Sequence, residues 1–178
     1  MITINHEYRK ETILPPGAGW GRLKSGVWLA GREDAPQSVV IHATHGQPGS
    51  RSASEALFLK QSRAVSAHYV IGRNNPPLVA QILDEMLVGW HAGDVRDPAF
   101  SNENSIGIEL HAATTEQILD WQKTALAELL TGIRERWHIN PIKMDTHRFI
   151  CDPPKRKSDP ATWSQAEFYH WRLINLGS

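Results

Sequence analysis

Two histidines and one aspartate have the residue types and the placement that a metal centre requires. His42 lies near the end of the apolar run 39–44, His147 ends the extended segment 142–147, and Asp159 follows twelve residues later. Histidine is the commonest metal ligand, and strand ends in α/β folds open onto sites. Two imidazoles and a carboxylate suffice to hold a catalytic zinc ion, with the fourth position left for water. The three residues together therefore predict a zinc site.

Each of these residues also has an ordinary structural interpretation. A histidine at the end of a buried strand is often a hydrogen-bonded core residue, and the pair Asp159-Pro160 is typical of a turn. Lys157 lies two residues before Asp159. A flexible cation beside a metal-bound carboxylate could stabilise an oxyanion, which favours the catalytic interpretation. The alternative is a solvated basic cluster over residues 155–157.

Glu109 is a candidate general base. It lies inside the alternating apolar segment 105–110, and apolar strands seldom hold a lone carboxylate. Close to a zinc-bound water, a carboxylate would serve as the base. The alternative is that Glu109 faces solvent on the polar side of the alternation.

Other residues could compete as ligands or contact a substrate. The histidines to be weighed are His45, His68, His91 and His111. No glutamate of the metalloprotease pattern lies between His42 and His45, and we expect the last three to line or support the pocket. Cys151 is expected to be a buried thiol rather than a zinc-bound thiolate. Trp90 is the best candidate for an aromatic side chain that faces a ligand.

Length and composition describe one domain with an ordinary core. The chain has 178 residues, of which 40% are hydrophobic and 21% charged, and such a chain can bury a core. Its net charge of zero gives no electrostatic footprint for nucleic acid or an anionic membrane. A single cysteine excludes an internal disulfide framework.

No targeting segment is recognised at the start of the sequence. The first residues lack the basic start and apolar core of a signal peptide. No stretch approaches the roughly 18–20 apolar residues of a spanning helix. We therefore expect a protein that is cytoplasmic on synthesis and does not insert into a membrane.

The elements that must position these residues alternate between strands and helices. Strands are predicted from β-branched and apolar residues at 39–44, 67–72, 78–83, 105–110 and 142–146. A Gly/Pro/Ser loop is predicted at 45–51, and mostly loop at 85–97. A capping box from Ser52 to Glu55 predicts a helix that ends near Val65.

Two further helices are predicted in the second half of the chain. The longest spans residues 115–137, and its apolar stripe is Ile118, Trp121, Ala125, Leu129, Ile133 and Trp137. A Pro/Lys loop covers 149–160, and a closing helix covers 164–173. The fold class is therefore α/β, with a mixed central β-sheet flanked by helices.

Six segments, taken in order, resemble one protein family. They are Ile41-His42-Ala43-Thr44, Ser66-Ala67-His68-Tyr69-Val70-Ile71, Trp90-His91-Ala92-Gly93, Asn104-Ser105-Ile106-Gly107-Ile108-Glu109-Leu110, Thr146-His147 and Lys157-Ser158-Asp159-Pro160. The chain resembles the zinc-dependent N-acetylmuramoyl-L-alanine amidases of the type-2 amidase and peptidoglycan-recognition-protein superfamily. The resemblance covers residues 36–165.

The resemblance implies a peptidoglycan-recognition-protein-like single domain over residues 1–178. Residues 1–36 are rich in Gly, Pro and charge and are expected to form an N-terminal arm. The catalytic core is expected over residues 37–165 and the C-terminal helix over residues 164–178. The expected partner is peptidoglycan or its muropeptides, with no nucleic acid, and the expected state is a monomer.

The resemblance also implies the chemistry of the site. His42, His147 and Asp159 match the Zn²⁺ ligands, Glu109 matches the catalytic carboxylate of the recycling amidases, and Lys157 matches the lysine that stabilises the tetrahedral intermediate. The bond cut would be the amide between N-acetylmuramic acid and the L-alanine of the stem peptide. The residues expected to contact substrate are His68, Trp90 and His91.

The sequence departs from other members of the superfamily at two positions. Some phage members carry a catalytic tyrosine just before the histidine of the second strand, where this chain has Ala67. The role of base is therefore assigned to Glu109. Several phage and animal members use cysteine as the third ligand, where this chain has Asp159.

Four functions are compatible with the sequence. The preferred one is a phage-type endolysin that acts on the cell wall after release, and the alternative enzyme is a cytoplasmic amidase that recycles anhydromuropeptides. A non-catalytic muropeptide-binding module is a third possibility, but such members usually replace the third ligand, so Asp159 favours an enzyme. A zinc hydrolase acting on another amide, such as a deacetylase, is the fourth.

Overall fold

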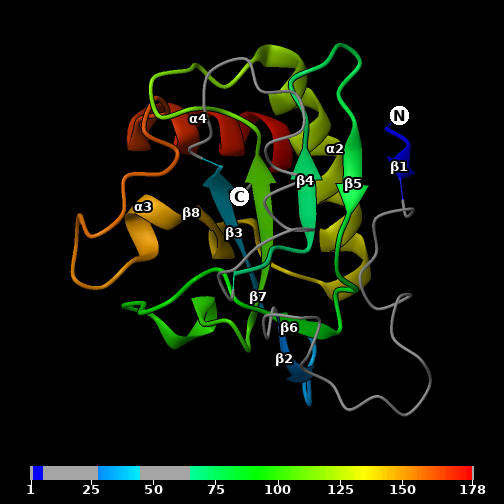
Figure 1. Ribbon diagram of the computed structural model, residues 1–178, viewed down its shortest axis with the longest axis vertical. Helices are drawn as coiled ribbons and strands as arrows, with labels where there is room; N and C mark the ends of the chain where they lie inside the picture. The colour runs from blue at the N-terminus through cyan, green and yellow to red at the C-terminus, as the bar shows by residue number, and fades with distance from the viewer. Residues whose placement is uncertain (1, 6–27, 45–64, 178) are drawn as a thin grey trace.

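A mixed six-stranded sheet runs through the centre of the protein (Figure 1). The computed structural model describes residues 2–5, 28–44 and 65–177. The strand order is β1-β5-β4-β7-β3-β8, and every neighbouring pair is parallel except β4 with β5. The strands are β1 Ile4–Asn5, β3 Ser38–Ala43, β4 Tyr69–Ile71, β5 Val79–Gln81, β7 Ser105–Leu110 and β8 Met144–Thr146. A separate antiparallel pair joins β2 Trp28–Gly31 to β6 Leu87–Gly89.

Two helices cover one face of the sheet (Figure 1). They are α2 Asp120–Trp137 and α4 Gln165–Leu176. The core between them and the sheet includes Ile41, Ile108, Leu126, Leu129 and Phe168. The described residues also form three short helical segments, which are η2 Pro98–Phe100, η3 Pro141–Lys143 and α3 His147–Ile150.

The two central strands explain where the site lies. Every residue of β3 is buried, as expected for an apolar strand with both faces covered. Because side chains alternate along a strand, Ile41 points into the helix-covered core and His42 points to the opposite face. In the parallel pairing, His42 lies beside Glu109 of β7.

Most predicted elements are confirmed. Strands lie within the predicted ranges 39–44, 67–72, 78–83 and 105–110, apart from an extra residue at the start of β3. The closing helix begins after the N-cap residue Ser164 and runs three residues past its predicted end. The predicted loop 45–51 and the helix from Ser52 lie outside the described residues, except for Val65.

The start of the long helix was placed wrongly by its apolar stripe. Helix α2 begins at Asp120, not at residue 115, and Trp121 is 36% exposed, whereas Gln122 is fully buried. The buried amide of Gln122 donates to the carbonyls of Ile71 and His111, at 3.3 and 3.1 Å. These carbonyls lie at the ends of β4 and β7, so a polar residue takes the inward position because it can satisfy them.

Two shorter differences concern turns. The predicted loop 85–97 contains β6, and the predicted strand 142–146 begins as the turn η3. The side chain of Asn140 caps this turn by accepting from the N–H of Ile142 at 3.0 Å. Among the described residues, no helix has both the length and the apolar character needed to span a bilayer.

A buried carboxylate ties the loop before β6 to the end of α2. Glu85 accepts hydrogen bonds from Tyr69 at 2.8 Å, from Arg136 at 2.6 and 3.0 Å, and from the indole N–H of Trp137 at 2.7 Å. Burial alone would raise the pKa of Glu85, but these hydrogen bonds outweigh burial and hold the pKa below its ordinary value. The ionised form is therefore the one that the fold stabilises.

We predict that Glu85→Gln lowers the free energy of unfolding by about 2–4 kcal/mol at neutral pH, because it removes one side of a buried ion pair. A carboxyl pKa that is lower in the folded state stabilises the fold above the unfolded-state pKa, and this contribution is lost as pH falls through the folded-state pKa. The deficit of the variant should therefore shrink below about pH 4. Urea unfolding at neutral pH and below about pH 4 measures the free energy of unfolding of both proteins.

The control for this prediction is Glu135→Gln, which changes an exposed carboxylate on the same helix. It should leave the free energy of unfolding unchanged within about 0.5 kcal/mol. A deficit in Glu85→Gln that stays the same at both pH values would contradict the assignment of its stabilising form.

Candidate metal centre

The sheet brings the two predicted histidine ligands together. His42 lies near the carboxyl end of β3, and His147 opens α3 directly after β8. Strand β8 runs parallel to β3, with Thr146 opposite Ile41, so the two histidines leave the sheet side by side. Their Nδ1 atoms are 3.0 Å apart, although 105 residues separate them in the chain.

Asp159 completes the group. The loop after α3 returns so that the carbonyl of Asp159 accepts from the N–H of Arg148 at 2.9 Å. Its Oδ2 lies 3.2 Å from Nδ1 of His42 and 3.1 Å from Nδ1 of His147. All three side chains are buried, so the predicted ligands do converge on one point.

Hydrogen bonds on the outer side of each imidazole fix its tautomer. Nε2 of His147 lies 2.9 Å from the carbonyl oxygen of Ala92, and a carbonyl only accepts, so this nitrogen carries the proton. Nε2 of His91 faces the carbonyl of Ser105 at 3.3 Å in the same way. Nδ1 of His91 is then the acceptor for Nε2–H of His42, at 3.2 Å. Both Nδ1 atoms of the ligand histidines therefore carry lone pairs.

This donor set fits a zinc ion. Three acceptor atoms 3.0–3.2 Å apart with no proton between them repel one another, and a cation at their centre removes the repulsion. Ligand atoms at ordinary Zn–N and Zn–O distances in a tetrahedral site would be about 3.3 Å apart. Nitrogen-rich sites suit zinc, whereas calcium and magnesium prefer all-oxygen sites.

Burial keeps the group in its metal-binding protonation state. Burial first, and the nearby His147 second, lowers the pKa of His42 to about 4. Burial would raise the pKa of Asp159, but its contacts with His147 and His42 hold that pKa well below its ordinary range. At neutral pH the first offers a neutral imidazole and the second a carboxylate.

Glu109 lies beside His42 on the next strand. Burial, and then the charge of Asp159, raises the pKa of Glu109 well above its ordinary value. Its Oε2 is buried and has no hydrogen-bond partner among the residues that the structure describes. Glu109 is therefore not a solvated surface residue, and the environment of its carboxyl group favours the protonated form more than water does.

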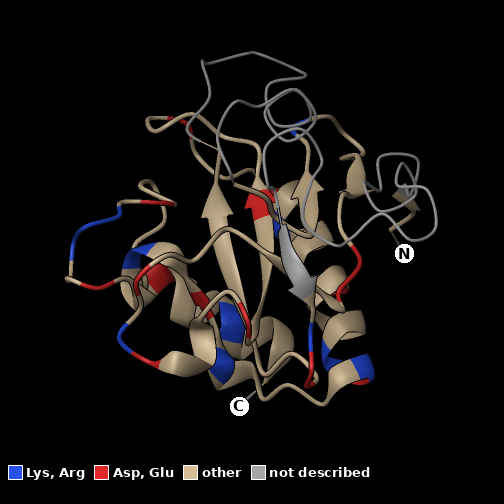
Figure 2. Cartoon of the chain, turned by 60° about the horizontal axis from the view of Figure 1, so that its bottom comes forward, with Lys and Arg blue, Asp and Glu red and all other residues tan. Residues whose placement is uncertain are grey.

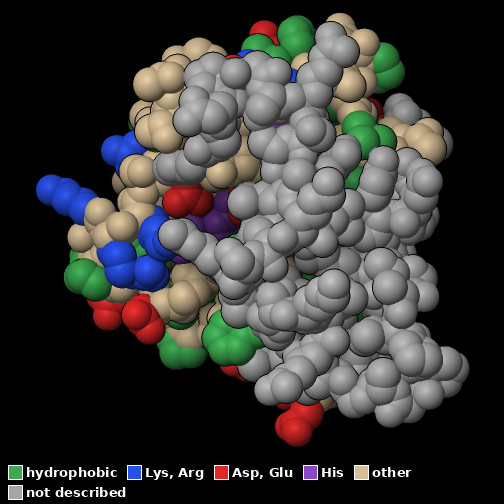
Figure 3. All heavy atoms as spheres, in the orientation of Figure 1, with side chains coloured by type: hydrophobic (Ala, Val, Ile, Leu, Met, Phe, Trp, Pro, Cys, Tyr) green, Lys and Arg blue, Asp and Glu red, His purple; other side chains and the backbone are tan. Residues whose placement is uncertain are grey.

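Lys157 supplies a positive charge at the same place. It lies half-buried in the loop after α3, which carries a run of basic side chains (Figure 2). Its positive charge lowers the pKa of both His42 and Glu109, in each case by less than burial changes it. Figure 3 shows histidine side chains recessed among acidic and basic ones.

His68 does not face the site with a free nitrogen. It is fully buried, and its Nδ1 accepts from the N–H of Gly107 at 2.9 Å. Nε2 must then carry the proton, which it donates to the carbonyl of Leu87 at 2.9 Å. Burial, followed by the charge of Arg32, lowers the pKa of His68 to about 3. In this geometry His68 ties β7 to β6, and its contact with substrate stays a prediction.

The other residues considered as metal ligands or substrate contacts differ in their exposure to solvent. The N–H of Trp90 donates to Oγ of Ser66 at 3.0 Å, and the carbonyl of Trp90 accepts from the N–H of Ser66 at 2.8 Å. Trp90 is 36% exposed, so its ring is available to a ligand. Cys151 is buried, and its thiol faces the carbonyls of Arg148 and Pro153, as predicted for a structural thiol. His111 is buried at the end of β7, and His45 lies outside the described residues.

Sequence reasoning missed a supporting arginine. The buried guanidinium of Arg32 donates to four backbone carbonyls, those of Glu85, Asn102, Glu103 and Ser105. It thereby fixes the segments that precede β6 and β7. No local pattern marks such a residue, because these four carbonyls lie 53 to 73 residues away in the sequence.

Sequence reasoning also missed the reason for a glycine in β7. A Cβ at Gly107 would lie 2.6 Å from the ring of His91. A glycine inside a strand pattern is a signal of such close approach.

Comparison with known proteins identifies the family. Residues 32–162 match the profile of the type-2 amidase family, described as N-acetylmuramoyl-L-alanine amidase. The chain belongs to this family. It is 31% identical over 152 residues to the N-acetylmuramoyl-L-alanine amidase AmiD of Escherichia coli strain K12, an alignment that covers 71% of the chain. The chain spans about half the length of that relative, 50%.

Solved structures share the fold. A crystal structure of AmpD is 26% identical, with a TM-score of 0.66, and the match covers 86% of this chain and 94% of that one. AmiD from E. coli, solved with its substrate anhydro-N-acetylmuramic acid-L-Ala-D-γ-Glu-L-Lys, is 28% identical with a TM-score of 0.61, covering 78% and 58%. A mutant endolysin from Bacillus subtilis has a TM-score of 0.70 at 18% identity, covering 97% and 98%, which shows the fold alone. The predicted fold class is therefore confirmed.

We predict that zinc raises the melting temperature of the metal-free protein and that Asp159→Ala removes this effect. Zinc at 1,000 times its dissociation constant would stabilise the folded state by about 4 kcal/mol. The variant keeps two histidines but loses the charged ligand. Calorimetry with and without zinc, together with metal analysis, checks both statements.

The matched control for this test is His170→Ala, which removes an exposed imidazole from α4. Its response to zinc should equal that of the unmodified protein. Full zinc content and an unchanged thermal shift in Asp159→Ala would show that the metal binds elsewhere.

Proposed function

We propose that this protein is a zinc-dependent amidase that hydrolyses the bond between the lactyl group of N-acetylmuramic acid and the L-alanine of the stem peptide. The observation that carries the proposal is the convergence of His42, His147 and Asp159 beside the buried carboxyl group of Glu109. Family membership supports the choice of amide. The substrate in the AmiD complex, an anhydromuramoyl peptide that begins with L-alanine, supports the same choice.

The roles of the side chains follow from their chemistry. A zinc ion held by the three ligands would polarise the amide carbonyl and lower the pKa of a water molecule towards ~7. Glu109 takes a proton from the attacking water as the C–O bond forms. It then passes this proton to the amide nitrogen as the C–N bond breaks, which releases the peptide with a free amino group. Lys157 places its ammonium group near the negative oxygen of the tetrahedral intermediate.

We predict that Glu109→Gln lowers kcat by roughly 100- to 10,000-fold, because the amide cannot accept the proton. Zinc affinity should be unchanged, since Glu109 is not a ligand. The activity of the unmodified enzyme should fall as pH drops through the raised pKa of Glu109, because only the ionised carboxylate acts as base. The acidic limb of kcat/KM should therefore lie above the ordinary carboxyl range of about 4.3.

Glu135→Gln, which alters an exposed carboxylate on α2, serves as the control and should keep full activity. Near-normal turnover in Glu109→Gln would remove Glu109 from the mechanism. Loss of zinc from that variant would show that the carboxylate supports the metal instead.

The substrate is tested by its products. We predict that digestion of purified sacculi or of soluble anhydromuropeptides releases stem peptides whose first residue is L-alanine, identified by mass spectrometry. A chelator should stop the release and added zinc should restore it. If neither substrate is cut while zinc is bound stoichiometrically, a binding module or a hydrolase of another amide takes the place of this proposal.

The two substrates distinguish two biological roles. Cleavage of intact sacculi supports the predicted endolysin. Cleavage of soluble anhydromuropeptides alone supports a recycling amidase, the second candidate, which the anhydromuropeptide in the AmiD complex favours. Monomeric state and location remain predictions from the sequence.

A further inference from the structure

One dipeptide contacts both metal-site histidines on the side away from the metal. Nδ1 of His91 lies 3.2 Å from Nε2 of His42, and the carbonyl oxygen of Ala92 lies 2.9 Å from Nε2 of His147. The two ligands come from different elements, β3 and α3. Their outer hydrogen bonds nevertheless end on consecutive residues of one loop.

This dipeptide is itself clamped. The side-chain oxygen Oδ1 of Asn102 accepts from the N–H of His91 at 2.9 Å and from the N–H of Ala92 at 2.8 Å. The methyl group of Ala92 is fully buried in a cluster with Val40, Phe100 and Ile150. The segment is therefore fixed at its backbone and at its small apolar side chain.

The ring of His91 is also fixed. It packs over Gly107, where no Cβ could fit, and its Nε2–H faces the carbonyl of Ser105 at 3.3 Å. That contact leaves Nδ1 as an acceptor aimed at His42. The partially exposed ring thus has both nitrogens engaged inside the protein, and neither is free for a substrate.

We propose that the segment His91–Ala92, clamped by Asn102, positions both zinc-binding imidazoles so that Nδ1 of each faces the metal. This inference rests on the zinc site of the proposed function. An outer acceptor fixes the tautomer and the ring orientation of a ligating histidine, and its loss typically weakens metal binding about 10- to 100-fold. Without it, His42 can carry its proton on Nδ1, where the proton occupies the position of the metal. His91 is thus a positioning residue for the metal instead of a substrate contact.

The test compares His91→Leu with His91→Asn in the full chain, with zinc affinity measured by competition with a chromogenic chelator. Asparagine places its Oδ1 on Cγ, where histidine places Nδ1, so it keeps the acceptor. Leucine has no acceptor. We expect the zinc dissociation constant to rise about 10- to 100-fold in His91→Leu and to stay within about threefold of the original in His91→Asn.

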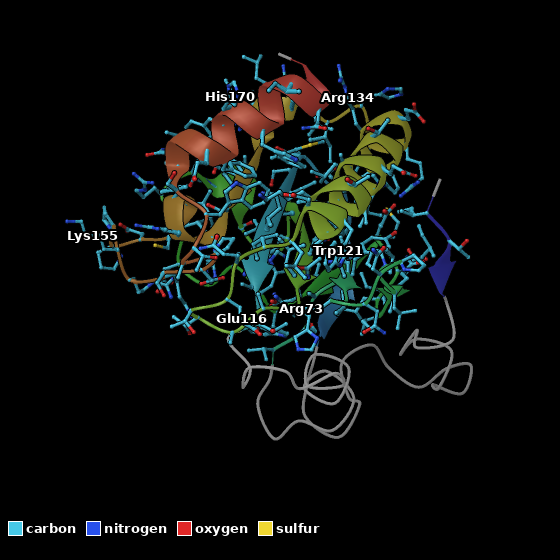
Figure 4. All side chains as sticks on the ribbon, turned by 90° about the horizontal axis from the view of Figure 1, so that it is seen from above. Arg73, Glu116, Trp121, Arg134, Lys155 and His170 are labelled. Atoms are coloured by element: carbon cyan, nitrogen blue, oxygen red, sulfur yellow. The ribbon has the colours of Figure 1, made fainter. Side chains whose placement is uncertain are left out.

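His170→Leu, on the outer surface of α4 (Figure 4), is the control for removal of an imidazole and should bind zinc normally. Unchanged zinc affinity in a folded His91→Leu variant would overturn the proposal. Equal losses in the leucine and asparagine variants would overturn it too, because they would point to packing instead of the acceptor.

A second measurement needs no variant. Nitrogen-15 NMR of histidine-labelled, zinc-loaded protein should show His42 and His147 protonated on Nε2, with His91 also protonated on Nε2. A zinc-loaded protein with the opposite tautomer at His42 would overturn the proposal even if His91→Leu fails to fold. Neither readout involves substrate. A protein that passes both tests and cuts no muropeptide would refute only the proposed function.

Discussion

Parallel pairing of β3 with both of its neighbours is the constraint on which the site depends. Strand β7 on one side places Glu109 beside His42, and β8 on the other side delivers His147. A shift of one residue in either pairing would turn these side chains to the helix-covered face. The register is fixed by the apolar residues of the opposite face, which have no other place to be buried. The hydrophobic core thus determines the geometry of the polar site.

The polar groups beneath the site are matched mainly by uncharged partners. His147 and His91 donate to backbone carbonyls, and Arg32 is surrounded by four carbonyls rather than by a carboxylate. Two neutral imidazoles and one carboxylate would leave a bound divalent ion with a net positive charge, which further acidic partners would reduce. A net positive centre next to Lys157 favours a substrate on which negative charge develops. This arrangement requires precise packing, because a buried donor that loses its acceptor is left unsatisfied away from water.

Much of the fold and the ligand set could be predicted from sequence because the signals are local. Apolar runs marked the central strands, and ligand residues at their ends marked the site. The errors came where distant groups decide a local outcome. Gln122 is buried because its amide group satisfies carbonyls at the ends of β4 and β7, although the predicted apolar stripe placed Trp121 inward. Asn102 and Arg32 support the site through contacts with backbone from other segments, which no spacing rule reveals. His68 directly precedes β4, and the backbone of Gly107 and Leu87 engages both of its ring nitrogens.

The ligands lie far apart in the chain, and this bears on when the site forms. Asp159 follows His42 by 117 positions in the sequence, so the chain must close a long loop before the two side chains meet. Closing such loops is slow, since their entropy is lost before the contacts that reward it are made. Until β8 has joined β3, only isolated histidines are available, and isolated histidines hold zinc weakly. A zinc ion bound at the proposed site would therefore be acquired late in folding, and its capture would report that the native topology is complete.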